Sequence, residues 1–221
     1  MNKEIIITKT LDGSKTIKNS EIDEYYHSTN GAIQESLHVF IKNGLCNIDK
    51  EKIKVLEIGF GTGLNAMLTY IYAEKNNKEV DYTGIELFPL DENIFSQLNY
   101  AELLNVDSKK YFFSLHICEW NKKQKLNESF IFTKYEIDVK DYQEEKCFDV
   151  IYFDAFSPDK QNYMWTETIL KKMYSLVAVG GIFVTYCSKG EVKRNLRSVG
   201  FTVKRLQGAA GKHHMVIGVK S

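Results

Sequence analysis

The sequence predicts an α/β fold with a mostly parallel sheet, because strand patterns alternate with helix patterns over most of its 221 residues. The clearest unit starts with the apolar run Val55 to Ile58. It continues through three glycines at alternate positions into an amphipathic segment, Leu64 to Glu74. A second strand pattern follows from Val80 to Ile85. Because parallel strands need long crossovers, this order of strand, turn, helix and strand indicates parallel pairing.

Residues 1–50 are predicted to form a small appendage, and residues 51–221 the main domain. The appendage starts with a hairpin pattern made of Ile5 to Ile7, an Asp12-Gly13 turn and Thr16-Ile17. A helix follows, with apolar side chains at positions i, i+4, i+7 and i+8 and a stop signal after them. These residues are Ile33, Leu37, Phe40 and Ile41, followed by Asn43-Gly44.

The main domain continues the alternation of helices and strands. A helix is predicted from Asp91 to Leu104, and the aromatic segment from there to about Phe132 has no assignable pattern. Further strands are predicted at Lys134 to Ile137, Phe148 to Phe153, Gly181 to Tyr186, Phe201 to Leu206 and Met215 to Val219, with helices at Thr166 to Leu176 and Gly190 to Val199. The last two strands are joined by the short turn Gln207 to His213, so we expect an antiparallel C-terminal pair.

Composition places the chain among ordinary globular proteins, with 43% apolar and 26% charged residues and a formal charge of zero. No run approaches the roughly 20 apolar residues that cross a bilayer, and the N-terminus lacks a signal-peptide pattern. We therefore expect a cytoplasmic protein without a membrane partner. The four cysteines contain no Cys-x-x-Cys pair and the five histidines do not cluster, which argues against a metal site.

The glycine loop and a downstream acid predict a site for a nucleotide-type cofactor. Gly59, Gly61 and Gly63 let the backbone pass close to a ligand, and the following helix N-terminus adds free N–H groups. Glu86 follows at about the 20-residue interval at which a carboxylate binds ribose hydroxyls. A dinucleotide fingerprint would need a small residue at Leu64, so NAD and FAD are disfavoured. A tight turn without a ligand is the structural alternative for the loop alone.

An acid two residues before Gly-x-Gly-x-Gly resembles the first motif of class I S-adenosylmethionine methyltransferases, which have a Rossmann-like fold. The resemblance implies S-adenosylmethionine as the cofactor, with its methionine and ribose over the glycine loop. The cofactor-binding residues that it implies are Glu57, Gly59, Phe60, Gly61, Gly63, Asn65, Glu86 and Asp138.

Asp138 and Asp154 each follow a predicted strand, at the edge of the sheet where α/β proteins bind ligands. We expect Asp138 near the adenine and Asp154 facing the methyl group. Helix N-capping is the structural alternative for both. For Asp154 the following residues favour a functional role, because a structural loop rarely needs Phe156, Tyr163 and Trp165 beside a carboxylate. Aromatic faces can stack flipped or single-stranded bases.

The block from Asp154 to Thr166 resembles the Asp-x-Phe-x-Pro...Met-Trp-Thr signature of the methyltransferase that completes 5-methylaminomethyl-2-thiouridine at the tRNA wobble position. That activity forms one half of the bifunctional MnmC-type enzymes and also occurs as a standalone, MnmD-like protein. Further matches cover nearly the whole chain: Tyr26-His27-Ser28, Gly31 to Ser36, Gly180-Gly181, and the ending from Lys189-Gly190 to Met215. Two places depart from the family pattern. They are Gln161-Asn162, where Asn-Pro is usual, and Lys212-His213-His214-Met215, where Lys-Arg-Glu-Met is usual.

The resemblance implies methyl transfer to the amine of 5-aminomethyluridine, with or without 2-thiolation, in a tRNA anticodon stem-loop. Because the attacking amine must be held in line and unprotonated, Asp154 is our candidate for orienting it and accepting a proton. The substrate contacts that the resemblance implies are Tyr26, Ser28, Phe156, Trp165, Lys189, Arg194 and Lys212. The sequence contains no second Gly-x-Gly-x-x-Gly unit, so no flavin is expected here and a separate enzyme must supply the aminomethyl precursor.

Other functions stay open: a small-molecule N- or O-methyltransferase, a polyamine synthase that uses a related cofactor, or a noncatalytic RNA-binding module. Retention of the glycine loop together with Glu57, Glu86 and Asp154 argues against the last. A basic C-terminal stretch, with Glu191 as its one acid, favours an anionic partner over a polyamine. Its residues are Lys189, Lys193, Arg194, Arg197, Lys204, Arg205 and Lys212. A solvated helix face is the alternative explanation.

Overall fold

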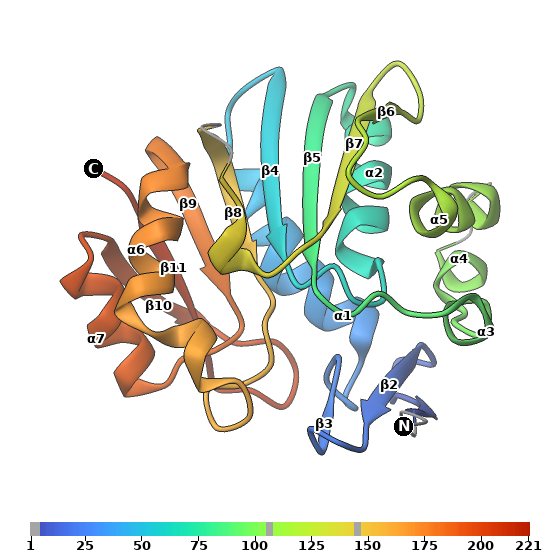
Figure 1. The fold of residues 1–221 in the computed structure, drawn as a ribbon, viewed down its shortest axis with the longest axis horizontal. Helices are drawn as coiled ribbons and strands as arrows, with labels where there is room; N and C mark the ends of the chain where they lie inside the picture. Colours follow the sequence, from blue (N-terminus) through green and yellow to red (C-terminus); the bar gives the residue numbers. More distant parts are fainter. Residues whose placement is uncertain (1–4, 105–107, 144–146) are drawn as a thin grey trace.

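The computed structural model describes residues 5–104, 108–143 and 147–221. Over these residues the main sheet has eight strands, in the order β10-β11-β9-β8-β4-β5-β7-β6 (Figure 1). The strands from β9 to β7 in this order pair in parallel, whereas β11, β10 and β6 pair antiparallel with their neighbours. The predicted α/β fold, with a mostly parallel sheet and an antiparallel C-terminal strand, is confirmed.

The bounds of the main-domain elements follow the predicted alternation. The strands are β4 (Lys52–Ile58), β5 (Glu79–Glu86), β6 (Gln124–Lys125), β7 (Phe130–Glu136), β8 (Phe148–Phe153), β9 (Val177–Thr185), β10 (Thr202–Gln207) and β11 (His214–Val219). The helices are α2 (Leu64–Asn76), α3 (Glu92–Phe95), α4 (Tyr100–Leu103), α5 (Ser108–Ile117), α6 (Glu167–Leu176) and α7 (Gly190–Ser198), with short 3-10 turns η3 (Val139–Asp141) and η4 (Asn162–Trp165).

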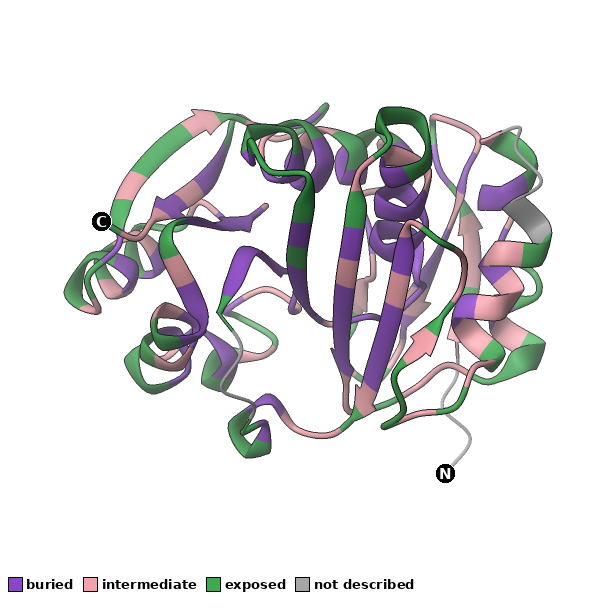
Figure 2. Ribbon diagram, turned by 90° about the horizontal axis from the view of Figure 1, so that it is seen from above, coloured by how far each residue is buried: buried purple, intermediate pink, exposed green. Residues whose placement is uncertain are grey.

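Helices cover both faces of the main sheet, and each face has its own core (Figure 2). On one face, α2 packs against strand residues such as Val55, Tyr82 and Tyr152. On the other, α6 and α7 pack against the alternate strand residues, including Leu56 and Phe153. Because neighbouring strand residues point to opposite faces, nearly continuous apolar strands are what a sheet covered on both sides requires.

The first 50 residues contain the predicted hairpin and the predicted helix. Strands β1 (Ile5–Lys9) and β2 (Lys15–Asn19) pair antiparallel, and β3 (Glu24–Tyr25) adds a third strand that the sequence analysis did not predict. The helix consists of α1 (Ala32–Ser36) and a π-helical continuation, η1 (Leu37–Lys42). Its Phe40 ring lies 5.2 Å from the Tyr152 ring of β8, within the core of the main sheet. The domain boundary at residue 50 stays a prediction.

The prediction of one helix from Asp91 to Leu104 is wrong, because the chain forms two helices, α3 and α4, with a bend between them. The Asn99 side chain explains the break. Its Oδ1 accepts a hydrogen bond from the backbone N–H of Lys15, and its Nδ2 donates to the carbonyl of Gly13. These two bonds tie the bend to the N-terminal hairpin, so tertiary contacts override the local helical pattern.

Two strands begin about four residues earlier than the sequence predicts. β7 starts at Phe130 instead of Lys134, and β9 starts at Val177 instead of Gly181. The register between β8 and β9 shifts between Phe148 and Val150 of β8. The pairing is therefore irregular at the start of β9, the part that was not predicted. The unassigned segment contains α5 and β6, while residues 105–107 of it lie outside the described residues.

Candidate active site

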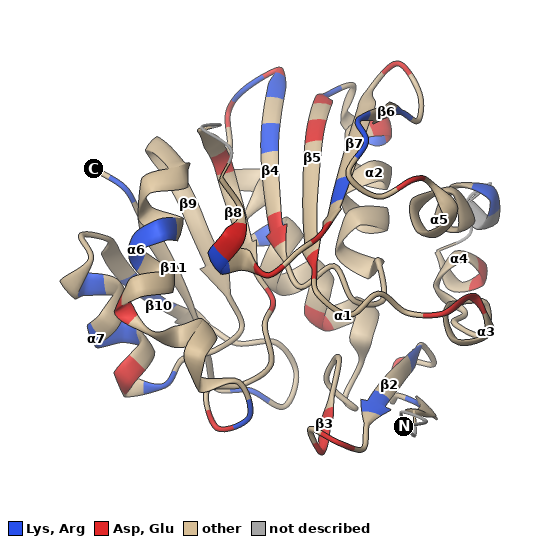
Figure 3. Cartoon of the chain, in the orientation of Figure 1, with Lys and Arg blue, Asp and Glu red and all other residues tan. Residues whose placement is uncertain are grey.

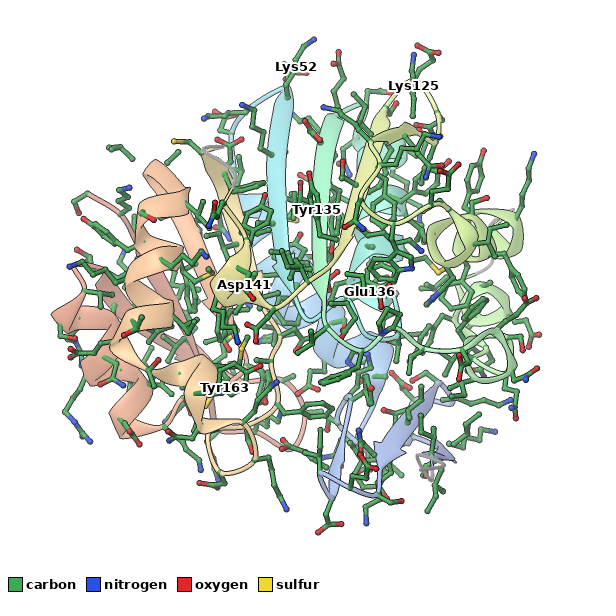
Figure 4. The ribbon with its side chains drawn as sticks, viewed as in Figure 1. Lys52, Lys125, Tyr135, Glu136, Asp141 and Tyr163 are labelled. Atoms are coloured by element: carbon green, nitrogen blue, oxygen red, sulfur yellow. The ribbon has the colours of Figure 1, made fainter. Side chains whose placement is uncertain are left out.

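A cavity of about 940 Å³ lies where β4, β5, β7 and β8 end, and the N-terminal sheet forms part of its wall. Figure 4 shows Tyr163, a wall residue, at this end of the molecule, whereas Lys52 and Lys125 lie at the opposite end. Most of the residues predicted from the sequence line this one cavity. They are Gly59, Phe60, Gly61, Asn65, Glu86 and Asp138 on the predicted cofactor side, and Tyr26, Ser28, Asp154, Phe156 and Lys212 on the predicted substrate side.

Glu57, Gly63 and Trp165 lie behind the cavity wall instead of in it. The Glu57 side chain is completely buried in β4, and Gly63 is the N-cap of α2 with a φ of 71°. Trp165 is 2% exposed and donates a hydrogen bond of 2.8 Å from Nε1 to the Phe156 carbonyl. These residues support the groups that line the cavity, and direct ligand contacts by them stay predictions.

Lys189 and Arg194 lie outside the cavity wall. The Lys189 ammonium forms an ion pair with Asp159, and Arg194 is exposed on α7. Figure 3 shows both basic and acidic residues along α7. Contacts of these two residues with an RNA backbone stay predictions.

The glycine loop passes between neighbouring strands with little space for side chains. Gly59 has a φ of 87°, and a Cβ there would lie 2.6 Å from the carbonyl oxygen of Asp154. The N–H groups of Gly59 and Phe60 both donate to the carbonyl of Ile85. A Cβ on Gly61 would lie 3.0 Å from the Tyr26 ring. The loop therefore lines the cavity with backbone at positions where a side chain would collide with neighbouring residues, which suits close approach of a cofactor.

Glu86 ends β5 beside this loop and lines the cavity. Its Oε2 accepts a hydrogen bond of 2.9 Å from the N–H of Gly61, and its Oε1 accepts one of 2.9 Å from the N–H of Phe88. A carboxylate oxygen can accept more than one hydrogen bond, so a carboxylate at this place is chemically suited to ribose hydroxyls. The loop itself thus holds this carboxylate in place, and its contact with a ribose stays a prediction.

Replacing Glu86 by alanine is expected to weaken cofactor binding by about ten- to a hundredfold, because hydrogen bonds to a charged group contribute about 1.5–3 kcal/mol. Titration calorimetry with S-adenosylmethionine measures the change. Glu136→Ala is a matched control, since Glu136 pairs in register with Glu86 but is exposed and does not line the cavity. An unchanged dissociation constant for Glu86→Ala would contradict the ribose role.

Asp138 serves as the N-cap of η3, the structural alternative that the sequence left open. Its Oδ1 accepts a hydrogen bond of 2.9 Å from the N–H of Lys140. The same side chain also lines the cavity. Its predicted place near an adenine stays a prediction, because N-capping alone accounts for the observed contact.

A buried chain of hydrogen bonds holds Asp154. Asn65 Nδ2 donates to Asp154 Oδ2 at 2.8 Å and to Glu57 Oε1 at 2.9 Å, and Tyr82 OH donates to Glu57 Oε2 at 2.7 Å. Burial raises the pKa of Glu57 well above its usual range, with the charges of Asp154 and Glu86 adding to the effect. Tyr82 and Glu57 thus fix Asn65, and Asn65 fixes the Asp154 carboxylate.

The Asp154 carboxyl faces the cavity and is otherwise surrounded by protein. Burial raises its pKa to about 7, the hydrogen bond from Asn65 opposes this rise, and the Glu35 charge adds to it. A carboxylate with a pKa near 7 is a far better proton acceptor than an ordinary aspartate. It is therefore suited to take a proton from an amine near neutral pH.

Aromatic side chains stand on two sides of the cavity. The Tyr26 ring lies edge-on to the Phe156 ring, with 5.1 Å between centroids. The exposed rings of Phe88 and Tyr163 line the wall as well, with exposed fractions of 57% and 44%. The aromatic block after Asp154 pointed to Tyr163, whereas no sequence signal pointed to Phe88. Exposed rings in a cavity wall can stack on planar bases.

Glu35 and Tyr186 line the cavity as well, although no sequence pattern indicated them as site residues. Lys212 Nζ lies 2.5 Å from Glu35 Oε1 and 4.1 Å from the centroid of the Tyr186 ring. All three line the cavity together with Asp154. Glu35 and Lys212 come from opposite ends of the chain, so no local pattern could reveal the pair.

The cavity wall is acidic. Over the described residues, seven carboxylates line it against a single lysine, Lys212. The carboxylates are Glu21, Glu24, Glu35, Glu86, Asp91, Asp138 and Asp154. The basic C-terminal stretch therefore does not make the cavity itself suited to an anionic partner, and the acidic wall suits a cationic ligand.

The described residues contain no group of three or more His, Cys, Asp or Glu side chains arranged to hold a metal ion. They also contain no helix that is long and apolar enough to span a bilayer.

A family model described as S-adenosyl-L-methionine-dependent methyltransferase matches residues 97–221. The whole chain is similar to the "tRNA 5-methylaminomethyl-2-thiouridine biosynthesis bifunctional protein MnmC" of Actinobacillus pleuropneumoniae serotype 5b, with 27% identity over 36% of that protein. The protein of the same name from Pseudoalteromonas atlantica is 29% identical over 94% of this chain and 32% of its own length. The chain thus spans about a third of the length of these curated relatives.

Among solved structures, the chain is similar to the crystal structure of MNMC2 from Aquifex aeolicus. The TM-score is 0.82 and the sequence identity is 26%. The match covers 100% of this chain and 71% of that one.

Proposed function

Because the chain belongs to the family of S-adenosyl-L-methionine-dependent methyltransferases, we propose that it methylates the amine of a modified wobble uridine in tRNA. The substrate is 5-aminomethyluridine or 5-aminomethyl-2-thiouridine, and the product carries a 5-methylaminomethyl group. The placement of Asp154 carries the proposal. Its carboxyl faces the same acidic cavity as the glycine loop and has a pKa of about 7. Similarity over the whole chain to MnmC proteins supports the choice of substrate.

The residues of the cavity fit the cofactor and the proton transfer that the reaction needs. When bound, S-adenosylmethionine would supply an activated sulfonium methyl group to the attacking amine, with the sulfur as leaving group. Asp154 takes one proton from the ammonium form of the substrate beforehand, which frees the nitrogen lone pair. Asn65 and Glu57 keep Asp154 in position for this transfer. Because the methyl group is already activated, positioning supplies most of the acceleration.

The proposal includes the anticodon stem-loop as the partner. Phe156 and Tyr26 would contact the wobble base, while the exposed Lys189 and Arg194 would contact the RNA backbone outside the cavity. Methyl transfer cannot itself create the aminomethyl group, so a separate enzyme would supply that precursor. We also propose that the protein is located in the cytoplasm, where tRNA is modified. The proposed reaction needs neither a flavin nor a metal ion.

Methyl transfer to tRNA tests the proposal directly. Purified protein is incubated with labelled S-adenosylmethionine and tRNA from cells that lack this gene, and the nucleosides are analysed by mass. We expect 5-aminomethyluridine to be converted to its N-methyl form, with rates that fall as salt rises because RNA contacts are electrostatic. Protein that binds the cofactor but leaves this tRNA unlabelled would contradict the proposal.

The acidic wall also favours a second candidate, an enzyme that methylates a free cationic amine. The same labelled cofactor, offered with spermidine and other small amines in place of tRNA, separates the two candidates. Labelling of tRNA alone favours the wobble uridine. Labelling of free amines at comparable rates favours the second candidate.

A further inference from the structure

The Lys212 ammonium sits in a ready-made cation site inside the cavity. Glu35, on α1, is 6% exposed, and its Oε2 accepts a hydrogen bond of 2.8 Å from the N–H of Ser28. Its Oε1 lies 2.5 Å from Lys212 Nζ. The backbone therefore fixes a desolvated carboxylate, and the charge of this carboxylate is balanced by one flexible lysine.

An aromatic face completes the site. Lys212 Nζ lies 4.1 Å from the centroid of the Tyr186 ring, a distance at which a ring face attracts an ammonium. Tyr186 OH donates a hydrogen bond of 2.9 Å to the Ala155 carbonyl, which holds the ring beside Asp154. A rigid carboxylate and a rigid ring thus form a place for a cation next to the candidate catalytic group.

Lys212, the cation at this place, is held less firmly than the Glu35 carboxylate. Lys212 lies in the turn between β10 and β11, and its side chain is 34% exposed, against 7% for the side chain of Glu35. A lysine side chain has four rotatable carbon bonds and can move its charge toward solvent. The protonated amine of the proposed substrate has the same chemistry as the lysine side chain, because both are a primary ammonium on a CH₂ group.

We propose that Glu35, the face of Tyr186 and Asp154 form a binding subsite for the protonated amine of the substrate. Lys212 occupies this subsite in the substrate-free protein and leaves when the amine enters. The inference rests on the proposed function in one respect, namely that the substrate is an amine. In this subsite Glu35 and Tyr186 recognise the amine, and Lys212 occupies the place of the amine in its absence.

Replacing the Lys212 ammonium by the substrate ammonium costs less free energy than removing Lys212 alone. Removing the partner of a buried carboxylate leaves an uncompensated charge and is strongly unfavourable. An entering ammonium keeps Glu35 paired throughout, whereas an unmodified uridine would displace Lys212 without replacing its charge. The subsite therefore selects an aminomethyl base over an unmodified one. The released Lys212 can then contact an RNA phosphate at the mouth of the cavity.

Direct binding of nucleosides tests the subsite without requiring any methyl transfer to tRNA. Protein saturated with S-adenosylhomocysteine is titrated calorimetrically with 5-aminomethyluridine and, in parallel, with uridine, which lacks the amine. We expect the parent protein to prefer the amine by about tenfold or more, in line with a desolvated cation–π contact plus an ion pair. Because these nucleosides carry no phosphate, contacts of Lys212 with RNA do not enter the measurement.

Two substitutions are expected to act in opposite directions. Glu35→Gln should abolish most of the preference for the amine, whereas Lys212→Met should tighten amine binding by about threefold or more, because the competing internal ammonium is gone. A purely structural ion pair would make both substitutions weaken binding alike. Tyr186→Leu, which removes the ring face, should also weaken amine binding and serves if Glu35→Gln does not fold.

The ion pair between Lys50 and Asp149 offers a matched control. Its atoms are 2.6 Å apart and the Asp149 side chain is 9% exposed, so Lys50→Met also removes the cation from a buried carboxylate. That pair lies outside the cavity wall, and we expect no change in amine binding. Equal binding of the two nucleosides by the parent, or weaker amine binding by Lys212→Met, would overturn the subsite. Failure of the proposed function would show instead as unlabelled tRNA with parent protein.

Discussion

Replacing Asp154 by asparagine is expected to lower kcat for methyl transfer by about 10²–10⁴-fold, the usual contribution of a positioned proton acceptor. Asparagine has nearly the same shape and cannot accept the proton of the ammonium. The dissociation constant for S-adenosylmethionine should change by less than about twofold, since we propose a substrate role for Asp154 and predict the ribose contact at Glu86. Calorimetry and initial-rate assays measure the two quantities.

The pH dependence follows from the raised pKa of Asp154, about 7. Proton acceptance requires the ionised carboxylate, so the kcat/KM of the parent should rise with pH and level off above about 7. The Asp154→Asn protein should lose this inflection. An equal loss of cofactor binding and turnover, or an unchanged pH profile, would show that Asp154 is structural.

The same raised pKa predicts a stability effect that serves as the folding control. The folded pKa lies above the unfolded value of 3.8, so between these values the native state binds more protons. Stability therefore falls as pH rises from about 4 to 7, because an ionised carboxylate must be buried. The asparagine variant should gain in Tm over the parent at pH 8 and not at pH 4.

Replacing Gly59 by alanine is expected to abolish measurable cofactor binding and to lower Tm. Two causes combine, a φ of 87° and a Cβ only 2.6 Å from the Asp154 carbonyl oxygen. A non-glycine residue in this backbone region costs about 1–3 kcal/mol, and the clash forces β4 and β8 apart at the cavity. Calorimetry with the cofactor and thermal melting followed by circular dichroism measure both effects.

Gly180→Ala separates the two causes. Gly180 has a similar φ of 78°, but a Cβ there would meet nothing within 4 Å. This variant should lose stability through backbone strain alone and bind the cofactor as the parent does. If Gly59→Ala bound the cofactor as well as Gly180→Ala, the close approach of the loop would have no role in binding.

The central part of the site was predictable from the sequence, because its signals are local. The glycine loop, Glu86 and Asp154 each stand directly beside a strand pattern, and the carboxyl ends of parallel strands meet at one edge of the sheet. The fold class followed from the alternation of periods 2 and 3.6 along the chain. These features depend on neighbours in sequence, which a single chain displays.

The rest depends on contacts between distant segments. The bend at Asn99 arises from hydrogen bonds to the N-terminal hairpin, and the pair of Glu35 and Lys212 joins α1 to the turn before β11. Glu57 reads from the sequence as a ligand contact, whereas its burial and its bond to Tyr82 come from the packing of β4 against β5. Neither periodicity nor motif spacing reports such partners.

The strand order has a consequence for how the protein is made. β11 is synthesised after β10, yet it lies between β10 and β9 in the sheet. A nascent chain that ends at β10 therefore exposes the open edge of β9, and its last completed strand has no partner. The turn that carries Lys212 can take its place in the cavity wall only when β11 enters that gap. A ribosome-bound chain should thus form the glycine loop before the proposed amine subsite.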